Sequence, residues 1–415
     1  MKIAVVGSGY VGLTTSVCFA KMGHVVTCID IDNKKVDMIN SGEPPIYEEG
    51  MKELLQSMIK KSSLKATTNS KEGITKSEIV FICVGTPSSD DGSINLDYIK
   101  SAAKTISENL NDYKVVVVKS TVVPGTTMNI VKPILDKSGK AFGLSMNPEF
   151  LKEGTAIKDF LEGDRVVLGV IDSKTEEKMR LLYKGFPQKI FVTNPTTAEM
   201  IKYSNNSLLA TKISFANEVG NVCKKIGIDV YDVMDAVGMD KRICRSFLDA
   251  GCGFGGSCFP KDVKALIKKG EETGEPMTLL KSVMEVNRKQ PSKIIALLKN
   301  HINPKGRKIC ILGLAFKKGT DDMRESPSIT IINELLQLGA KVVAYDPKAM
   351  ENAKKIFDGK VNFAKSAKEA VDESDAVLII TDWDEFKKED LYKGKIVIAG
   401  RKIKTAAAVY DGICW

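Results

Sequence analysis

The sequence predicts an α/β protein in which two doubly wound parallel sheets are joined by a long central helix and a helical region. Short apolar runs alternate with helical stretches from the N-terminus, and the same alternation restarts after residue 300. Between them, residues 196–225 carry apolar side chains at helical spacing, with no glycine or proline before Gly220. We therefore expect domains at 1–195, 196–300 and 301–415.

The composition is that of a globular protein with more than one core. The chain has 415 residues, of which 43% are hydrophobic and 27% charged. No apolar run is long enough for a bilayer, and the N-terminus enters a strand pattern without a signal-peptide cleavage site, so we expect a cytoplasmic protein without a membrane partner. The net charge of +9 is spread over the chain, without a basic run that alternates with aromatic residues. Nucleic acid is therefore not an expected partner.

Cysteine and histidine usage limits the chemistry. Nine cysteines, odd in number and without a Cys-x-x-Cys pair, argue against a disulfide framework and against a metal site. The two histidines are His24, which opens an apolar strand pattern, and His301, which lies near a helix end. Both are therefore expected to be structural. Proton transfer would then depend on Lys, Asp, Glu, Cys or ordered water.

The first strand pattern, at 2–7, ends in a glycine fingerprint. Gly7-Ser8-Gly9-Tyr10-Val11-Gly12 is Gly-x-Gly-x-x-Gly between a strand and a helix, and the next strand, 25–29, closes with Asp30. The glycines allow a tight turn and let a pyrophosphate approach the helix N-terminus. An acid at this distance binds the ribose hydroxyls of NAD and repels the extra phosphate of NADP. The pattern predicts a Rossmann-like NAD domain, with Lys35 either near the adenosine or solvated.

Polar residues follow the next apolar strands, which we expect at 78–84, 114–120 and 143–146, with 165–171 as the last strand of this domain. Ligands bind at the carboxyl ends of parallel strands. One crevice should therefore be lined by Thr86, Ser120, Thr121 and Glu149. A single such residue would more often be a turn residue or a helix cap, but four on one edge weaken that interpretation.

The long helix carries a polar face. Glu199, Lys202 and Asn206 share that face by their spacing, and Lys202 and Asn206 could point together at a reacting centre. The helix pattern alone favours a surface Glu–Lys pair followed by a polar patch. A helix of this length can also connect domains and carry a dimer interface.

The stretch from Gly251 to Asp262 is the strongest chemical signal. Four glycines precede Cys258, and Pro260 stiffens the exit from the loop. Lys261 would favour a thiolate, and Asp262 could accept or relay a proton. Taken alone, the loop is more typical of a glycine-rich turn with a buried, inert cysteine. Upstream, Arg242 and Arg245 could meet a phosphate, including one in a partner subunit.

In the third region the α/β alternation returns, with strands expected at 307–312, 341–345, 376–380 and 395–399. The first turn lacks the full glycine fingerprint, so a second nucleotide of a different kind is the natural inference. Lys317 and Arg401, at strand ends, could face a diphosphate, although an isolated basic residue at such a place is more often solvated.

Six motifs, in family order, make the chain similar to the UDP-glucose/GDP-mannose dehydrogenase family over essentially its whole length. They are Gly7–Gly12, Lys119-Ser-Thr-Val122, Asn147-Pro-Glu-Phe-Leu-Lys-Glu-Gly154, Glu199-Met-Ile-Lys-Tyr-Ser-Asn-Asn206, Gly253-Phe-Gly-Gly-Ser-Cys-Phe-Pro-Lys-Asp262 and Gly313-Leu-Ala-Phe-Lys317. The resemblance implies an N-terminal NAD domain, a central helical dimerisation region and a C-terminal domain for the UDP part of a nucleotide sugar.

The resemblance also implies two successive oxidations, of UDP-glucose to UDP-glucuronate. The C6 alcohol becomes an aldehyde, Cys258 captures it as a thiohemiacetal, a second hydride leaves to give a thioester, and water hydrolyses the thioester. Lys202 would bind or deprotonate the C6 oxygen and, with Asn206, stabilise the oxyanion. Asp262 would support an ordered water, and whether it, Lys202 or that water is the first base stays open. Glu149 would be the base for hydrolysis, and Thr121 would position a water or the cofactor.

The resemblance further implies two sets of binding residues. NAD would meet Gly7, Gly9, Tyr10, Val11, Gly12, Asp30, Lys35, Thr86, Ser120, Thr121, Glu153 and Arg324. The substrate would meet Glu149, Phe150, Leu151, Lys152, Glu153, Lys202, Asn206, the loop from Asp249 to Gly255 that includes Phe254, and Phe316, Lys317 and Arg401, together with Arg242 from the neighbouring subunit of a homodimer. Cys244 stands where many relatives would have glycine, so the turn around it is expected to differ.

Other functions stay open at this point. GDP-mannose oxidation would use the same cysteine loop, and the Gly-Gly-Ser-Cys sequence speaks against a UDP-N-acetylhexosamine. A non-catalytic NAD-binding regulatory protein would be expected to lose the nucleophile, the lysine or the asparagine. A 2-hydroxy acid dehydrogenase would leave Cys258 and the second nucleotide domain unexplained.

Overall fold

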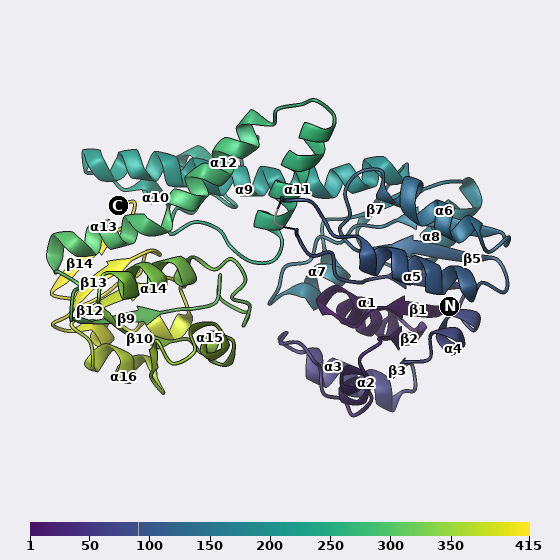
Figure 1. Cartoon of the computed structure of the whole chain (residues 1–415), viewed down its shortest axis with the longest axis horizontal. Helices are drawn as coiled ribbons and strands as arrows, with labels where there is room; N and C mark the ends of the chain where they lie inside the picture. Colours follow the sequence, from purple (N-terminus) through teal and green to yellow (C-terminus); the bar gives the residue numbers. More distant parts are fainter. Residues whose placement is uncertain (90) are drawn as a thin grey trace. The chain divides into compact units, whose positions relative to one another are not determined.

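The computed structural model describes residues 1–89 and 91–415. These residues form two compact units, Met1–Ser204 and Asn205–Trp415, each built on its own sheet (Figure 1). The predicted α/β class, with two doubly wound sheets and a long central helix, is confirmed.

The first unit contains an eight-stranded sheet in the order β3-β2-β1-β4-β5-β6-β7-β8. Its elements are β1 (Lys2–Val6), α1 (Tyr10–Lys21), β2 (Val25–Ile29), α2 (Asn33–Asn40), α3 (Met51–Lys60), β3 (Leu64–Thr67), α4 (Ser70–Thr75), β4 (Ile79–Ile82), α5 (Asp97–Glu108), β5 (Lys114–Val118), the π-helix η1 (Thr127–Val131), α6 (Lys132–Asp136), β6 (Phe142–Met146), α7 (Ala156–Glu162), β7 (Arg165–Val170), α8 (Ser173–Leu182) and β8 (Lys189–Thr193).

All pairings in this sheet are parallel except that of β6 with β7. The strand order reverses between β1 and β4, which is where a doubly wound sheet opens its ligand crevice. The prediction that the strand at 165–171 is the last one was wrong, because β8 follows it. β3 was also missed. Both are short and only partly buried, so neither shows the continuous apolar run of a central strand.

The central strands of this unit are buried on both faces. Ile3, Val5, Phe81 and neighbours pack under α1, α3 and α8, whereas Ala4, Val80 and neighbours pack under α5 and α6. Because both faces are covered, the strands read as unbroken apolar runs, and this made them predictable.

Helix α9 (Pro195–Ile226) is 32 residues long and matches the predicted helix at 196–225. It begins with proline at its first position, where no backbone N–H is needed. It ends before Gly227, whose φ of +75° lets the chain leave the helix in the left-handed region. The residues of α9 from Asn205 onward belong to the second unit.

The second unit contains a six-stranded, all-parallel sheet in the order β11-β10-β9-β12-β13-β14 (Figure 1). Its further elements are α10 (Val230–Gly238), α11 (Phe259–Glu272), α12 (Thr278–Lys289), α13 (Pro291–His301), β9 (Lys308–Leu312), α14 (Pro327–Gln337), β10 (Lys341–Tyr345), α15 (Met350–Phe357), β11 (Asn362–Phe363), α16 (Ala367–Asp372), β12 (Ala376–Ile379), the 3-10 helices η2 (Asp384–Lys387) and η3 (Glu389–Tyr392), β13 (Ile396–Ala399) and β14 (Val409–Gly412). The edge strands β11 and β14 were not predicted, since one has two residues and the other carries Asp411 and Gly412.

Two further observations concern the described residues as a whole. Within 1–89 and 91–415, no helix combines the length and the apolar character that crossing a membrane would need. All nine cysteines are free thiols, and only Cys244 and Cys258 are exposed.

Candidate active site

The glycine loop between β1 and α1 has the shape that the fingerprint predicts. Gly7 has a φ of +99°, and a side chain there would meet the carbonyl of Cys83 at 2.5 Å. A Cβ at Gly12 would overlap the carbonyl oxygen of Gly7. At Gly9, by contrast, no atom of the protein lies within 4 Å of the Cβ position. The loop is therefore closely packed at its first and third glycines and open at the second, where a pyrophosphate would approach.

Asp30, directly after β2, is held against this loop. Its carboxylate accepts hydrogen bonds from the Ser8 amide (2.8 Å), the Ser8 hydroxyl and the Asp32 amide (3.0 Å). Burial alone would raise the pKa of Asp30, but these bonds and the charge of Lys35 bring it below its ordinary value. Asp30 is therefore anionic and preorganised beside the open glycine, as ribose recognition requires.

Tyr10 has a second role that its place in the fingerprint did not reveal. Its hydroxyl donates to the buried carboxylate of Glu48, which also accepts from the amides of Gly154 and Ala156 at 2.7 Å each. Burial and Glu48 raise the pKa of Tyr10 strongly. The first turn of α1 is thus tied to the segment at 149–156, which holds Glu149 and Glu153.

The predicted strand-end residues lie at the ends of β4 and β5. The Ser120 hydroxyl donates to the carbonyl of Val84 at 2.7 Å, so it joins the ends of these two strands. Thr86 is buried and Thr121 is half-buried. In the structure the Ser120 side chain binds the backbone, and its predicted contact with NAD stays a prediction.

Glu149 and Lys202 form a buried ion pair, with the Lys202 Nζ 3.0 Å from a carboxylate oxygen of Glu149. The other carboxylate oxygen accepts from the Leu151 amide at 2.6 Å. Burial alone would raise the pKa of Glu149, but Lys202, the Leu151 amide and Lys119 hold it below its ordinary value. The ring of Phe150 lies near both the Lys202 ammonium (5.3 Å) and the Arg165 guanidinium (4.1 Å). Lys152 pairs instead with Asp159.

The interpretation of Glu199 and Lys202 as a surface pair was wrong. Glu199 is fully buried, and its carboxylate accepts from the amides of Gly125 (2.6 Å) and Thr127 (2.7 Å) and from the Thr127 hydroxyl. These contacts fasten α9 to the segment that follows β5. Glu199 is thereby a support for Lys202, one turn further along the helix.

Sequence reasoning missed the buried lysine at the start of the second motif. Lys119 donates to the side-chain oxygen of Asn147 at 3.1 Å, and the Tyr183 hydroxyl donates to the same oxygen at 2.6 Å. Burial lowers the pKa of Lys119 to about 8. The signal was present, because Lys119 directly follows the four valines of β5 and a charge in such a run is rarely solvated.

In the second unit, Cys258 is the N-cap residue of α11, and its side chain is exposed. The interpretation of this thiol as buried was wrong. A helix N-terminus attracts negative charge and so favours a thiolate at this position. Lys261 donates to Asp262 at 2.6 Å, so it is part of an ion pair in the same helical turn.

Asn206 is positioned by Asp262. Its amide nitrogen donates to the Asp262 carboxylate at 2.7 Å, and both side chains are buried. Asp262 therefore orients the amide that was predicted to stabilise an oxyanion. Lys202 and Asn206 lie one turn apart on α9, as their spacing predicted.

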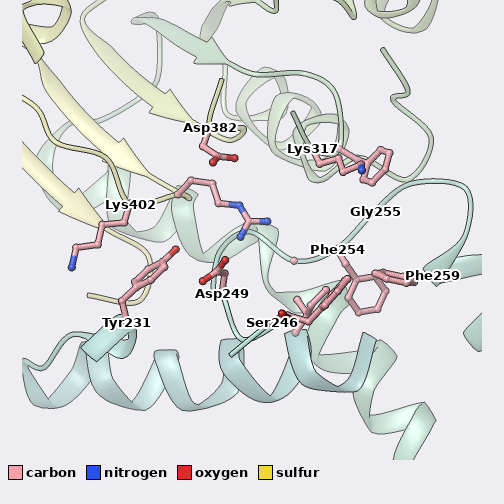
Figure 2. A pocket seen from close by; sticks show the side chains of 14 residues that line it. Tyr231, Ser246, Asp249, Phe254, Gly255, Phe259, Lys317, Asp382 and Lys402 are labelled. Atoms are coloured by element: carbon pink, nitrogen blue, oxygen red, sulfur yellow. The ribbon is translucent and has the colours of Figure 1, made fainter. Parts of the chain in front are cut away.

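A cavity of about 430 Å³ lies in the second unit (Figure 2). Six predicted substrate residues line it, namely Asp249, Phe254, Gly255, Phe316, Lys317 and Arg401. A seventh lining residue, Gly253, lies in the predicted substrate loop 249–255, whereas seven others were not predicted, namely Ile213, Tyr231, Ser246, Phe247, Phe259, Asp382 and Lys402. Figure 2 shows Tyr231 and Lys402 at one end and Lys317, Phe254 and Phe259 at the other, with Asp249 and Asp382 between them. Aromatic surfaces and basic groups of this kind suit a nucleotide.

Arg401 contributes a positive charge to this cavity. Its guanidinium lies 3.4 Å from the carbonyl of Ala250, and a side chain at Gly251 would meet the Gly400 carbonyl oxygen at 2.5 Å and this guanidinium at 3.2 Å. Burial alone would lower the pKa of Arg401, but Tyr231, Asp382 and Asp249 raise it, so the group stays charged. The close fit explains why the cysteine loop has glycine at position 251.

Arg242 and Arg324 lie outside this cavity. The Arg242 side chain is 89% exposed and pairs with Asp240, and Arg324 pairs with Asp322. Near Arg242, Cys244 has a φ of +64°, the region that favours glycine, and the Lys212 ammonium donates to its carbonyl at 2.9 Å. The turn can therefore form without glycine.

A glycine loop of this geometry places the first unit among dinucleotide-binding domains. Comparison with known proteins narrows this class. The chain belongs to the UDP-glucose/GDP-mannose dehydrogenase family, because the models of the family's NAD binding, central and UDP binding domains match residues 1–187, 196–289 and 310–406. NAD as the cofactor and the predicted family resemblance are thereby confirmed.

Individual relatives cover nearly the whole chain. It is 45% identical to the UDP-glucose 6-dehydrogenase TuaD of Bacillus subtilis, over 97% of this chain and 89% of the relative. It is 43% identical to the UDP-glucose 6-dehydrogenase AglM of Haloferax volcanii, over 98% and 97%. The structure of a UDP-glucose dehydrogenase from Pyrobaculum islandicum superposes with a TM-score of 0.97 at 40% identity, covering 100% of this chain and 97% of the other.

Proposed function

We propose that this protein oxidises the C6 alcohol of UDP-glucose to a carboxylate with two molecules of NAD, giving UDP-glucuronate. The family domains for NAD and UDP and the UDP-glucose 6-dehydrogenase relatives support this substrate and cofactor. One observation carries the four-electron reaction, namely an exposed cysteine at the N-terminus of α11 whose neighbours Gly255 and Phe259 line the cavity. An alcohol-to-aldehyde dehydrogenase needs no nucleophile, whereas covalent capture of an aldehyde does.

NAD supplies the hydride acceptor in each oxidation, and the residues of the first unit that fit it are the open Gly9 and the anionic Asp30. The C6 hydroxyl first loses its proton to Lys202 or to a water supported by Asp262, and loses its hydride. The Cys258 thiolate then adds to the aldehyde carbon. Loss of a second hydride from C6 leaves a thioester on Cys258.

Hydrolysis closes the cycle. We assign Glu149 as the base that takes a proton from the attacking water, after which the C–S bond breaks and Cys258 leaves as the thiolate. The burial of Lys202 and Asn206 supports their assignment to the C6 oxyanion, because hydrogen bonds to charge are strongest where water is excluded. Thr121 is assigned to positioning water or NAD.

For the UDP part, we assign Lys317 and Arg401 to the diphosphate and the aromatic residues of the cavity to the nucleoside. The charge held on Arg401 by Asp249 and Asp382 supports this assignment. A planar guanidinium also matches the geometry of phosphate oxygens better than an ammonium does.

We further propose a homodimer formed through the helices of the central region, 196–300. On α9, Leu208, Phe215 and Val222 recur every seven residues and are 63%, 51% and 56% exposed. Such an apolar ridge on a long helix is typical of helix–helix association. Arg242, exposed and outside the cavity of its own chain, is assigned to the UDP-sugar of the partner subunit.

The test is the number of NADH molecules formed per UDP-glucose when the sugar is limiting and NAD is in excess. Two per sugar, with UDP-glucuronate as the product, is the expected result. One per sugar would mean that the reaction stops at the aldehyde and that the role of Cys258 is wrong. No NADH with UDP-glucose, but NADH with GDP-mannose or a UDP-N-acetylhexosamine, would move the chemistry to another nucleotide sugar.

A further inference from the structure

Lys119 is a buried ammonium group that the proposed reaction does not yet use. It directly follows the four buried valines of β5 and is itself 3% exposed. Its Nζ lies 3.1 Å from the Asn147 side-chain oxygen and 5.6 Å from the centre of the Phe160 ring. Burying a lysine ammonium without a counter-charge is unfavourable, because the charge loses its hydration. A compensating anion is therefore to be expected nearby.

The groups that act on the charge of Lys119 come from four elements or their ends. They are Cys18 on α1, Cys83 after β4, Glu149 after β6 and Lys202 on α9. Burial raises the pKa of the Cys18 and Cys83 thiols to about 12, so both are neutral near pH 7. Among these four groups, Glu149 is thus the one that is anionic at neutral pH. Its carboxylate contacts Lys202 directly and acts on the charge of Lys119 through space.

Asn147 gives this pairing a direct structural link. Its side-chain oxygen accepts from Lys119 and Tyr183, while its side-chain nitrogen donates to the Val167 carbonyl at 2.8 Å. Both the oxygen and the nitrogen of the buried Asn147 side chain therefore have hydrogen-bond partners, and these partners are three different residues. Because Asn147 is two residues before Glu149, the network fixes the start of the segment that carries the carboxylate.

We propose that Lys119 is a positioning residue for thioester hydrolysis, whose ammonium acts through Asn147 and through space to hold the Glu149 carboxylate ionised and in place. This inference rests on the proposed function, in which Glu149 takes the proton of the attacking water. Hydroxide then bonds to the C6 carbonyl carbon, the C–S bond breaks, and Cys258 leaves as the thiolate. Lys119 exchanges no proton in this step.

The expected pH dependence follows from the charges around Glu149. Lys202 and Lys119 both favour its carboxylate form, and the Leu151 amide donates to it. Removing the charge of Lys119 should raise the pKa of Glu149, so that the base becomes ionised only at a higher pH. The acidic limb of the hydrolysis rate should then move toward higher pH.

The experiment compares Lys119→Met with Lys114→Met. Lys114 is the buried first residue of β5, at the end of the strand opposite to Lys119, and its Nζ donates to the backbone carbonyls of Thr75 and Ser77. Both changes remove a buried ammonium at one end of β5, but only one removes the link to Asn147. With UDP-glucose and excess NAD, we would follow NADH formation and the mass of the intact acyl-enzyme from about pH 5 to about pH 9.

Lys119→Met should release a rapid burst of two NADH per site, accumulate the acyl-enzyme and show the shifted acidic limb. Lys114→Met should lose stability but keep the wild-type pH profile. If Lys119→Met does not fold, Lys119→Gln tests the same point, because it removes the charge while it can still donate to Asn147. A wild-type profile in the folded Lys119 variant, or the same shift in Lys114→Met, would overturn the inference.

Glu149→Gln separates this inference from the proposed function. If this variant accumulates acyl-enzyme and the folded Lys119 variants do not, only the inference fails. If Glu149→Gln hydrolyses the thioester at the wild-type rate, or if the wild-type protein makes no NADH from any of the three kinds of nucleotide sugar, the proposed function fails and the inference with it.

Discussion

The glycine loop allows a prediction that separates folding from cofactor binding. At Gly9 the backbone angles, φ −68° and ψ −170°, are open to any residue, and an added Cβ would have no neighbour within 4 Å. Alanine restricts the unfolded chain, which stabilises by about 0.4–1 kcal/mol. Alanine is also a poorer N-cap residue than glycine, which costs a similar amount. The two effects should nearly cancel, so Gly9→Ala should fold with close to wild-type stability.

Gly9→Ala should nevertheless bind NAD poorly. The new methyl group would stand in the open space beside the first turn of α1, where a pyrophosphate must come within hydrogen-bonding distance of the backbone. Losing one charge-assisted hydrogen bond costs about 1.5–3 kcal/mol, which corresponds to roughly a 10- to 150-fold weaker Kd. Isothermal titration with NAD measures this change directly.

Gly12→Ala is the matched control variant, because this substitution should lower the stability of the fold. Its Cβ would overlap the Gly7 carbonyl oxygen and lie 2.9 Å from the Gly7 carbonyl carbon and 3.1 Å from the Cys83 Cβ. Two of these atoms are backbone, so the strand and the helix must move apart, at a cost of about 1–3 kcal/mol or more. Thermal unfolding without NAD should therefore show a clear loss for Gly12→Ala and almost none for Gly9→Ala. Wild-type NAD affinity in Gly9→Ala would refute the assignment of this loop to pyrophosphate.

Three further variants test other parts of the site. Cys258→Ser should bind NAD and UDP-glucose normally but stop before a thioester, and chromatography showing UDP-glucuronate at the wild-type rate would contradict the covalent step. Arg401→Met should raise the KM for UDP-glucose at least about tenfold while the Kd for NAD is unchanged, since the NAD binding domain matches residues 1–187; an unchanged KM would remove Arg401 from the diphosphate site. Burial raises the pKa of Glu199 above its ordinary value of 4.5, so its contribution to stability is present below that value and is lost as the pH rises through the folded value. The free energy of unfolding in urea, measured at several pH values, should therefore not show this decline for Glu199→Gln. If it changed with pH in the same way for the variant and the wild type, Glu199 would not titrate as inferred.

Several parts of the molecule could be predicted because their signals are local. The unbroken apolar runs of β1, β4 and β5 reflect burial on both faces, and the spacing along α9 reflects one buried helical face. The fingerprint at Gly7–Gly12 requires only a strand, a turn and a helix that are adjacent in the chain. The edge strands β3, β8, β11 and β14 were missed because short, half-exposed segments leave only a weak periodicity.

The sequence by itself therefore determined the fold class, the NAD loop, the long helix and the identity of the residues proposed for the chemistry. Only the tertiary structure decided which partner each buried charge has. Glu199 binds the backbone at Gly125 and Thr127, and Glu48 joins Tyr10 to the 149–156 segment. Lys119 meets Asn147, 28 residues away. Such pairings depend on how the strands are ordered in the sheet, and a charged side chain carries no local pattern that names its distant partner.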